Sequence, residues 1–120
     1  MTTYRTSVIV TTEIEGLHCW PAAKVVFPEV DFLSDLHRHI FHIKASKEVF
    51  HDDRDVEFIM FKRDVHSYIS LKYYDTDKRC ANFGSMSCEA IAREICDYFN
   101  CLWVEVWEDK ENGARVECIN

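Results

Sequence analysis

Two histidines separated by a single residue could bind a metal ion. His37 and His39 lie in Leu36–Phe50, where polar and apolar residues alternate as they do in a β-strand. This alternation places the two imidazoles on one face, about 6.5 Å apart along the chain, and turns His42 to the other face. Both rings can therefore bind one zinc ion at Zn–N distances of about 2.0–2.1 Å, provided that a neighbouring strand supplies a third ligand.

His18 is the candidate for that third ligand. It follows the first predicted strand, and sequential strands usually pair, so antiparallel pairing would bring His18 beside His37 and His39. Three histidine ligands leave one coordination position open, as in catalytic zinc sites that polarise a substrate oxygen or lower the pKa of a bound water. In the alternative interpretation the motif arises by chance in a chain with six histidines, and the rings are structural.

Glu108 ends an otherwise apolar row of side chains in Leu102–Glu108. Strand alternation puts it on the same face as the leucine and the two valines of that segment. Burial of an ionised carboxylate costs several kcal/mol unless it is paired, so Glu108 is expected to contact an internal partner or a ligand donor. The alternative is a solvated carboxylate at a strand end. Trp103 and Trp107, on the other face, are expected to cover a core or a subunit contact.

The elements that must position these residues follow the order strand, strand, helix, helix, strand, strand, which is an α+β pattern. Gly16 is expected to end or bend the first strand, and Ser87 is expected to cap the second helix. The predicted elements are the strand Tyr4–Glu15, a hairpin of Leu36–Phe50 with Val56–Phe61, a helix from Phe61 to about Tyr73, a helix from Ser87 to Phe99, and a hairpin of Leu102–Glu108 with Ala114–Ile119.

The composition indicates one compact domain over residues 1–120. The chain is 48% hydrophobic, 29% charged and carries a formal net charge of −7, which disfavours binding to nucleic acid and to anionic membranes. No apolar run approaches the roughly 20 residues that span a bilayer, and the first residues lack the features of a signal peptide. We therefore expect a soluble cytoplasmic protein whose six cysteines are free thiols.

Together these residues resemble the 6-pyruvoyl and 6-carboxy tetrahydropterin synthases. The resemblance rests on an upstream histidine, Leu-His-x-His at 36–39, Ser-x-Glu at 87–89 and Val-x-Val-x-Glu at 104–108, and it spans nearly the whole chain. It implies the tunnelling fold, in which two antiparallel helices cover a four-stranded antiparallel sheet and subunits form a homo-oligomeric barrel. It also implies zinc ligation by His18, His37 and His39, and a pterin ring held by Glu108.

The chain departs from this family at the residues that transfer protons. Leu33 occupies the slot of the family's catalytic cysteine, and Asp77 occupies that of its catalytic histidine. Asp35 lies close to the missing thiol and could replace it as a general base. If the protein is an enzyme, Asp35 or Asp77 is therefore expected to move protons.

Two functions follow from the resemblance, and a third interpretation does without it. The first is zinc-dependent lyase-type chemistry on a reduced pterin such as dihydroneopterin triphosphate. The second is a catalytically degenerate relative that binds a purine, pterin or related nucleotide, or a protein partner, without turnover. The third is an oligomeric structural domain with an incidental histidine cluster. An oligomer is expected in each case, because an open sheet would leave exposed edges.

Overall fold

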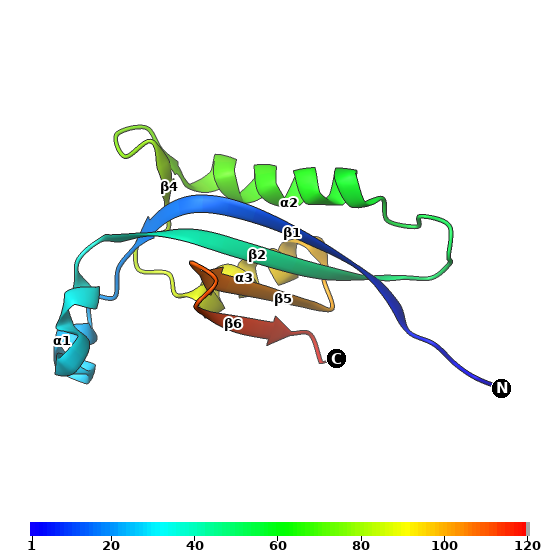
Figure 1. Cartoon of the computed structure of the whole chain (residues 1–120), viewed down its shortest axis with the longest axis horizontal. Coiled ribbons are helices and arrows are strands. Elements are labelled where there is room, and N and C mark those ends of the chain that lie inside the picture. The colour runs from blue at the N-terminus through cyan, green and yellow to red at the C-terminus, as the bar shows by residue number, and fades with distance from the viewer. Residues whose placement is uncertain (120) are drawn as a thin grey trace.

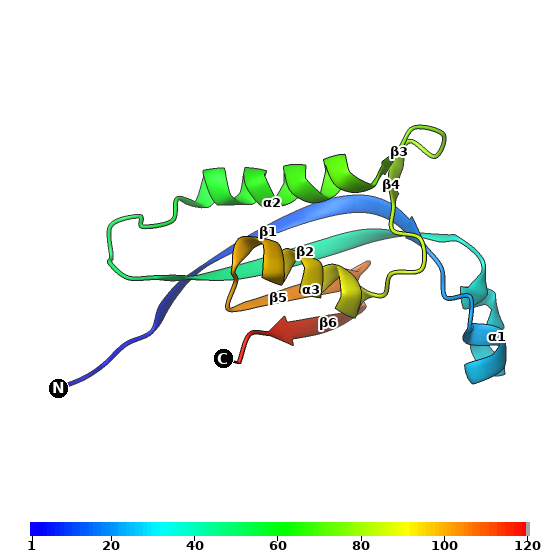
Figure 2. The ribbon, with the colours of Figure 1, turned by 180° about the vertical axis from the view of Figure 1, so that it is seen from behind.

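The computed structural model describes residues 1–119 as an α+β fold with one six-stranded sheet (Figures 1 and 2). The strands are β1 (Thr6–His18), β2 (His37–Val49), β3 (Tyr74–Asp75), β4 (Cys80–Asn82), β5 (Trp103–Glu108) and β6 (Asn112–Glu117). The helices are α1 (Ala23–Val26), the 3-10 helix η1 (Pro28–Ser34), α2 (Phe58–Tyr73) and α3 (Cys88–Phe99). None of the helices in these residues has the length and hydropathy to cross a bilayer.

The sheet has the order β3-β4-β1-β2-β5-β6. The four long strands β1, β2, β5 and β6 are antiparallel neighbours, as expected. The expected total of four strands is nevertheless wrong, because β3 and β4 add a short hairpin whose second strand runs parallel to β1. These strands have two and three residues, too few for an alternating pattern to reveal them in the sequence.

Strand β2 pairs with β1 and not with the segment Val56–Phe61, so the predicted hairpin is wrong. That segment instead contains the start of α2. The Glu57 carboxylate accepts hydrogen bonds from the backbone N–H groups of Ile59 and Met60, at 3.0 and 3.1 Å, and so caps the helix. Glutamate is uncommon at this position, which explains why the helix start was not predicted here.

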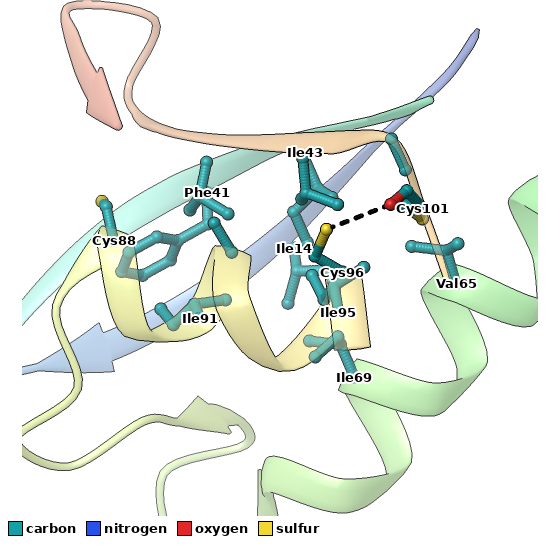
Figure 3. Close-up of a cluster of buried hydrophobic side chains, with 14 of the residues drawn as sticks. Ile14, Phe41, Ile43, Val65, Ile69, Cys88, Ile91, Ile95, Cys96 and Cys101 are labelled. Carbon is teal, nitrogen blue, oxygen red and sulfur yellow. Dashed lines mark hydrogen bonds between the residues drawn. The ribbon is translucent and has the colours of Figure 1, made fainter. Parts of the chain in front are cut away.

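Helices α2 and α3 run in opposite directions across the same face of the sheet (Figure 2). Between them and the strands lies one apolar core, in which Phe41 and Ile43 of β2 face Ile91 and Ile95 of α3 (Figure 3). The predicted cap of α3 is confirmed, because Ser87 Oγ accepts a hydrogen bond from the backbone N–H of Ala90 at 3.1 Å. The cap fixes where α3 begins beside the ends of β1 and β5.

A polar clamp joins the two helices on the outside of the core. The Tyr73 hydroxyl of α2 donates a hydrogen bond to Glu94 Oε1 of α3 at 2.6 Å, and Lys72 Nζ lies 3.3 Å from Glu94 Oε2. Burial, reinforced by the neighbouring Glu94 carboxylate, raises the pKa of Tyr73 to about 12. The clamp therefore requires a protonated tyrosine.

We expect this tyrosine to make the fold sensitive to alkali. Between its ordinary pKa and about 12, Tyr73 is ionised in the unfolded chain and protonated in the folded one, so the free energy of unfolding falls as the pH rises. The expected loss is about 1 kcal/mol by about pH 11, measured by denaturant unfolding against a reference at about pH 9. Tyr73→Phe should remove this loss. Tyr4→Phe, at an exposed position, should leave it unchanged; equal pH profiles for Tyr73→Phe and the parent protein would contradict the assignment.

Candidate metal and ligand site

Three histidines converge at the end of the sheet where β1 ends and β2 begins. His18 is the last residue of β1 and lies directly opposite His37, the first residue of β2. The sequence placed the end of this strand at Gly16, but β1 continues for two further residues. One ligand nitrogen from each of His18, His37 and His39 lies within 4.8 Å of the others, so the group could hold a metal ion.

All three rings are held through Nδ1, which leaves Nε2 as the nitrogen available to a metal ion. His18 Nδ1 donates a hydrogen bond to the Met86 carbonyl at 2.9 Å, and His37 Nδ1 donates to the Asp35 carbonyl at 2.8 Å. His39 Nδ1 lies 2.7 Å from Asp109 Oδ2. A proton on each Nδ1 places the lone pair of the neutral ring on Nε2, as ligation by that nitrogen requires.

The Nε2 atoms of His18 and His39 are buried, and neither has a hydrogen-bond partner among residues 1–119. A buried polar atom without a partner costs free energy, and a metal ion would remove that cost. The His18 ring has Phe41 beside it at 5.2 Å between ring centroids, so the histidines rest on an apolar floor. The three histidines therefore fit a zinc ion, because Nδ1 is engaged in each ring and two of the Nε2 atoms have no hydrogen-bond partner in the described chain.

Glu108 lies beside the histidines at the end of β5. Its Oε2 is 3.1 Å from His18 Nε2 and its Oε1 is 3.6 Å from His39 Nε2; both are ion-pair contacts outside hydrogen-bond geometry. The contact with His18 lowers the pKa of Glu108 in spite of its partial burial. Burial acts to lower the pKa of His18, but Glu108 and the Met86 carbonyl outweigh it and the net shift is upward. The predicted internal partner of Glu108 is thus the histidine group itself.

Cys88 is a site residue that the sequence did not identify as functional. It is the first residue of α3, next to Phe41 (Figure 3), and its thiol donates a hydrogen bond to Glu108 Oε2 at 3.6 Å. Burial, together with the Glu108 charge, raises the pKa of this thiol to about 12, so it stays protonated and acts as a donor. The sequence feature that could have indicated its role is its position directly after Ser87, the residue that caps α3.

His18, His37 and Glu108 line a cavity of about 480 Å³. Its walls come from the ends of β1 and β5, from the start of β6, from η1 and from the start of α3. Trp20, Leu33 and Met86 supply its apolar side. Ligand-binding cavities combine apolar walls with a few converging polar groups, which is the arrangement found here.

Comparison with solved structures shows a protein with a similar fold. The chain is similar to an uncharacterized protein from Wolinella succinogenes, with a TM-score of 0.64 and 11% sequence identity over 96% of this chain and 99% of that one. At this identity the likeness establishes the fold alone. No protein-family model and no curated protein matches the sequence.

The two acids suggested for proton transfer lie outside the cavity that residues 1–119 form. The Asp35 backbone carbonyl orients His37, but the residue itself is exposed and does not line the cavity. Asp77 is exposed in the β3–β4 turn, where its backbone N–H donates to Asp75 Oδ1 at 2.9 Å. Leu33, which the resemblance aligns with a catalytic cysteine, does line the cavity, so an aliphatic group occupies that position.

Asp109 positions His39 although no sequence motif indicated it. Its Oδ2 lies against His39 Nδ1, and its Oδ1 accepts a hydrogen bond from the backbone N–H of Ile40 at 2.8 Å. The residue adopts a left-handed backbone with φ of 53° in the turn between β5 and β6. Both oxygens are thus engaged in fixing the end of β2 that carries His37 and His39.

We expect Asp109→Asn to lower zinc affinity by about 10- to 100-fold, the usual effect of losing a partner of a ligating histidine. Competition with a chromophoric chelator measures the change. Asp35→Asn is the matched control, since only the backbone carbonyl of Asp35 contacts a histidine. Equal affinities for Asp109→Asn and the parent protein would show that Asp109 has no positioning role.

Gly16 makes room for the floor of the site. A Cβ atom at this position would lie 2.7 Å from Phe83 and 3.1 Å from Phe41. The residue lies opposite His39 in the β1–β2 pairing, so any shift there reaches the histidine group. This close approach, and not a strand end, explains the glycine.

Gly16→Ala is expected to lower the free energy of unfolding by about 1–3 kcal/mol, as overpacking of a filled core does. Denaturant unfolding measures the loss. Phe83→Leu, which shortens the ring contacted most closely, should recover part of it in the double variant. Strictly additive effects of the two substitutions would contradict this steric account.

Proposed function

We propose that this protein binds a zinc ion through His18, His37 and His39 and holds a flat nitrogen heterocycle, such as a pterin or purine, on Glu108. The observation that carries the proposal is the convergence of one ring nitrogen from each of three histidines beside a carboxylate at the wall of a cavity. A bound zinc ion supplies a Lewis acid that polarises a carbonyl or hydroxyl oxygen.

Glu108 suits a heterocycle that presents two adjacent N–H donors. Its ionised carboxylate has two oxygens, each able to accept one of these hydrogen bonds. The lowered pKa keeps the group ionised at neutral pH. Trp20 and Leu33 provide apolar surface on the same cavity for the face of the ring.

The proposal includes descent from the tetrahydropterin synthases with loss of their reaction. Leu33 has no proton to exchange at the position where the resemblance requires a thiol. The exposed carboxylates of Asp35 and Asp77 do not line the cavity of the described chain. We therefore favour ligand binding without turnover over lyase-type chemistry on a reduced pterin.

The proposed assembly is a homo-oligomeric barrel. β4 pairs with β1 only at Gly16 and Leu17, so within residues 1–119 the outer edge of β1 from Thr6 to Glu15 has no strand partner. Strand edges of this length are usually covered, and pairing with β6 of another copy would cover both free edges. Light scattering on the purified protein gives the oligomer size.

The test combines metal analysis with ligand binding. We expect close to one zinc ion per chain after loading and dialysis, and saturable binding of 7,8-dihydroneopterin by the loaded protein. Failure to retain zinc, or absence of pterin and purine binding in loaded protein, would overturn the proposal. Conversion of dihydroneopterin triphosphate to a new product by the loaded protein would instead establish the lyase-type enzyme, which the open fourth position of a three-histidine site favours.

A further inference from the structure

The charges around the cavity are all of one sign. Two carboxylates, Glu89 and Glu108, line it, whereas no lysine or arginine of residues 1–119 does. The uncharged polar lining comes from Ser85, Ser87 and Asn112. A third carboxylate, that of Asp109, lies behind the histidines at 2.7 Å from His39 Nδ1.

Basic residues close to the site in sequence are turned away from it. Arg38 lies between His37 and His39, and strand alternation directs it to the opposite face of the sheet, where it pairs with Glu15. Lys110 follows Asp109 and borders a separate hollow on that opposite face. The local topology therefore keeps the Arg38 and Lys110 side chains out of the cavity.

The N-terminus of α3 also faces the cavity but is already compensated. Ser87 Oγ accepts the N–H of Ala90, and Glu89 places a negative charge in the first turn. A carboxylate in that turn offsets the positive end of the helix dipole. A bound zinc ion would similarly meet two carboxylates, Glu108 beside the histidines and Asp109 behind His39.

We infer that the site takes an unphosphorylated heterocycle with a short hydroxylated side chain and discriminates against its triphosphate ester. The inference rests on the proposed binding of a heterocycle on Glu108. A triphosphate would bring several negative charges toward Glu89, into a chain of net charge −7, and would find no lysine or arginine among the described cavity residues. Ser85, Ser87 and Asn112 can instead bind hydroxyl groups.

Calorimetric titration of the zinc-loaded full chain with 7,8-dihydroneopterin and with dihydroneopterin triphosphate tests the inference. We expect the triphosphate to bind at least about tenfold more weakly at low salt, and the difference to shrink as the ionic strength increases. Zinc content is measured after each titration, so that metal extracted by the triphosphate is not counted as binding.

Charge reversal at the mouth of the cavity sharpens the test. Glu89→Lys should reduce the preference for the unphosphorylated compound by about fivefold, because attraction replaces repulsion at that position. Glu111→Lys changes the net charge equally outside the cavity, in the β5–β6 turn, and should leave the preference unchanged.

Each outcome has a separate meaning. Weaker binding of the triphosphate that responds to Glu89→Lys supports the inference. Equal or tighter binding of the triphosphate by the parent protein, or a preference that Glu89→Lys leaves unchanged, overturns the inference and leaves the proposed function intact. Binding of neither compound overturns both.

Discussion

Replacing His39 with alanine is expected to lower zinc affinity by more than about a hundredfold, since each ligand carries a large share of the binding free energy of a zinc site. The His39 ring lies close to both other rings, with centroids 5.2 Å from His18 and 5.0 Å from His37. It is also the ring that both Glu108 and Asp109 contact. Competition with a chelator of known affinity, followed by elemental analysis after dialysis, measures the loss.

His42→Ala is the matched control for this substitution. His42 lies on the same strand three residues away, but on the opposite face, where its Nδ1 is 3.4 Å from Glu13. Zinc affinity should therefore remain within about twofold of the parent value, as expected for a site outside the ligand set. Equal losses for His39→Ala and His42→Ala would mean that zinc is bound elsewhere or only adventitiously. Circular dichroism of both variants checks that the sheet is retained.

The histidine pair was predictable from the sequence because strand alternation is a local property. A period of two puts His37 and His39 on one face whatever the strand pairs with. Predicting the third histidine required two further facts. Strand β1 extends through Gly16, and its register with β2 sets His18 opposite His37. The sequence indicated the pairing of the two strands, but glycine is a strand-ending signal by itself. Only the approach of Phe83 and Phe41 explains its presence inside the strand.

The residues around the three histidines were not predictable for a different reason. Asp109 occupies a turn, and aspartate is common in turns because its side chain bonds nearby backbone groups. Its contact with His39 depends on the pairing of β2 with β5, which brings Phe41 opposite Glu108. Cys88 likewise has the burial expected of a small apolar residue, and its contact with Glu108 appears only when α3 is docked on the sheet. Both roles arise from tertiary contacts between elements that are distant in the chain.

Glu108→Gln is expected to weaken binding of 7,8-dihydroneopterin by at least about a hundredfold, since each hydrogen bond to a charged group contributes about 1.5–3 kcal/mol. The substitution preserves the size of the side chain, but a glutamine amide accepts through its oxygen alone. Its NH₂ group would then face one of the two N–H donors of the ring without a partner. Calorimetric titration of zinc-loaded protein measures the change.

Glu105→Gln is the matched control for the ligand carboxylate. Glu105 lies on the same strand but on the opposite face, where it contacts Trp107 and Arg115. We expect pterin affinity within about twofold of the parent value for this variant, and for both variants a zinc content close to that of the parent protein. Unchanged pterin affinity in Glu108→Gln would show that this carboxylate does not bind the heterocycle. A parallel loss of zinc in that variant would show that Glu108 acts on the metal and not on the heterocycle, because its two oxygens already lie 3.1 and 3.6 Å from the Nε2 atoms of His18 and His39.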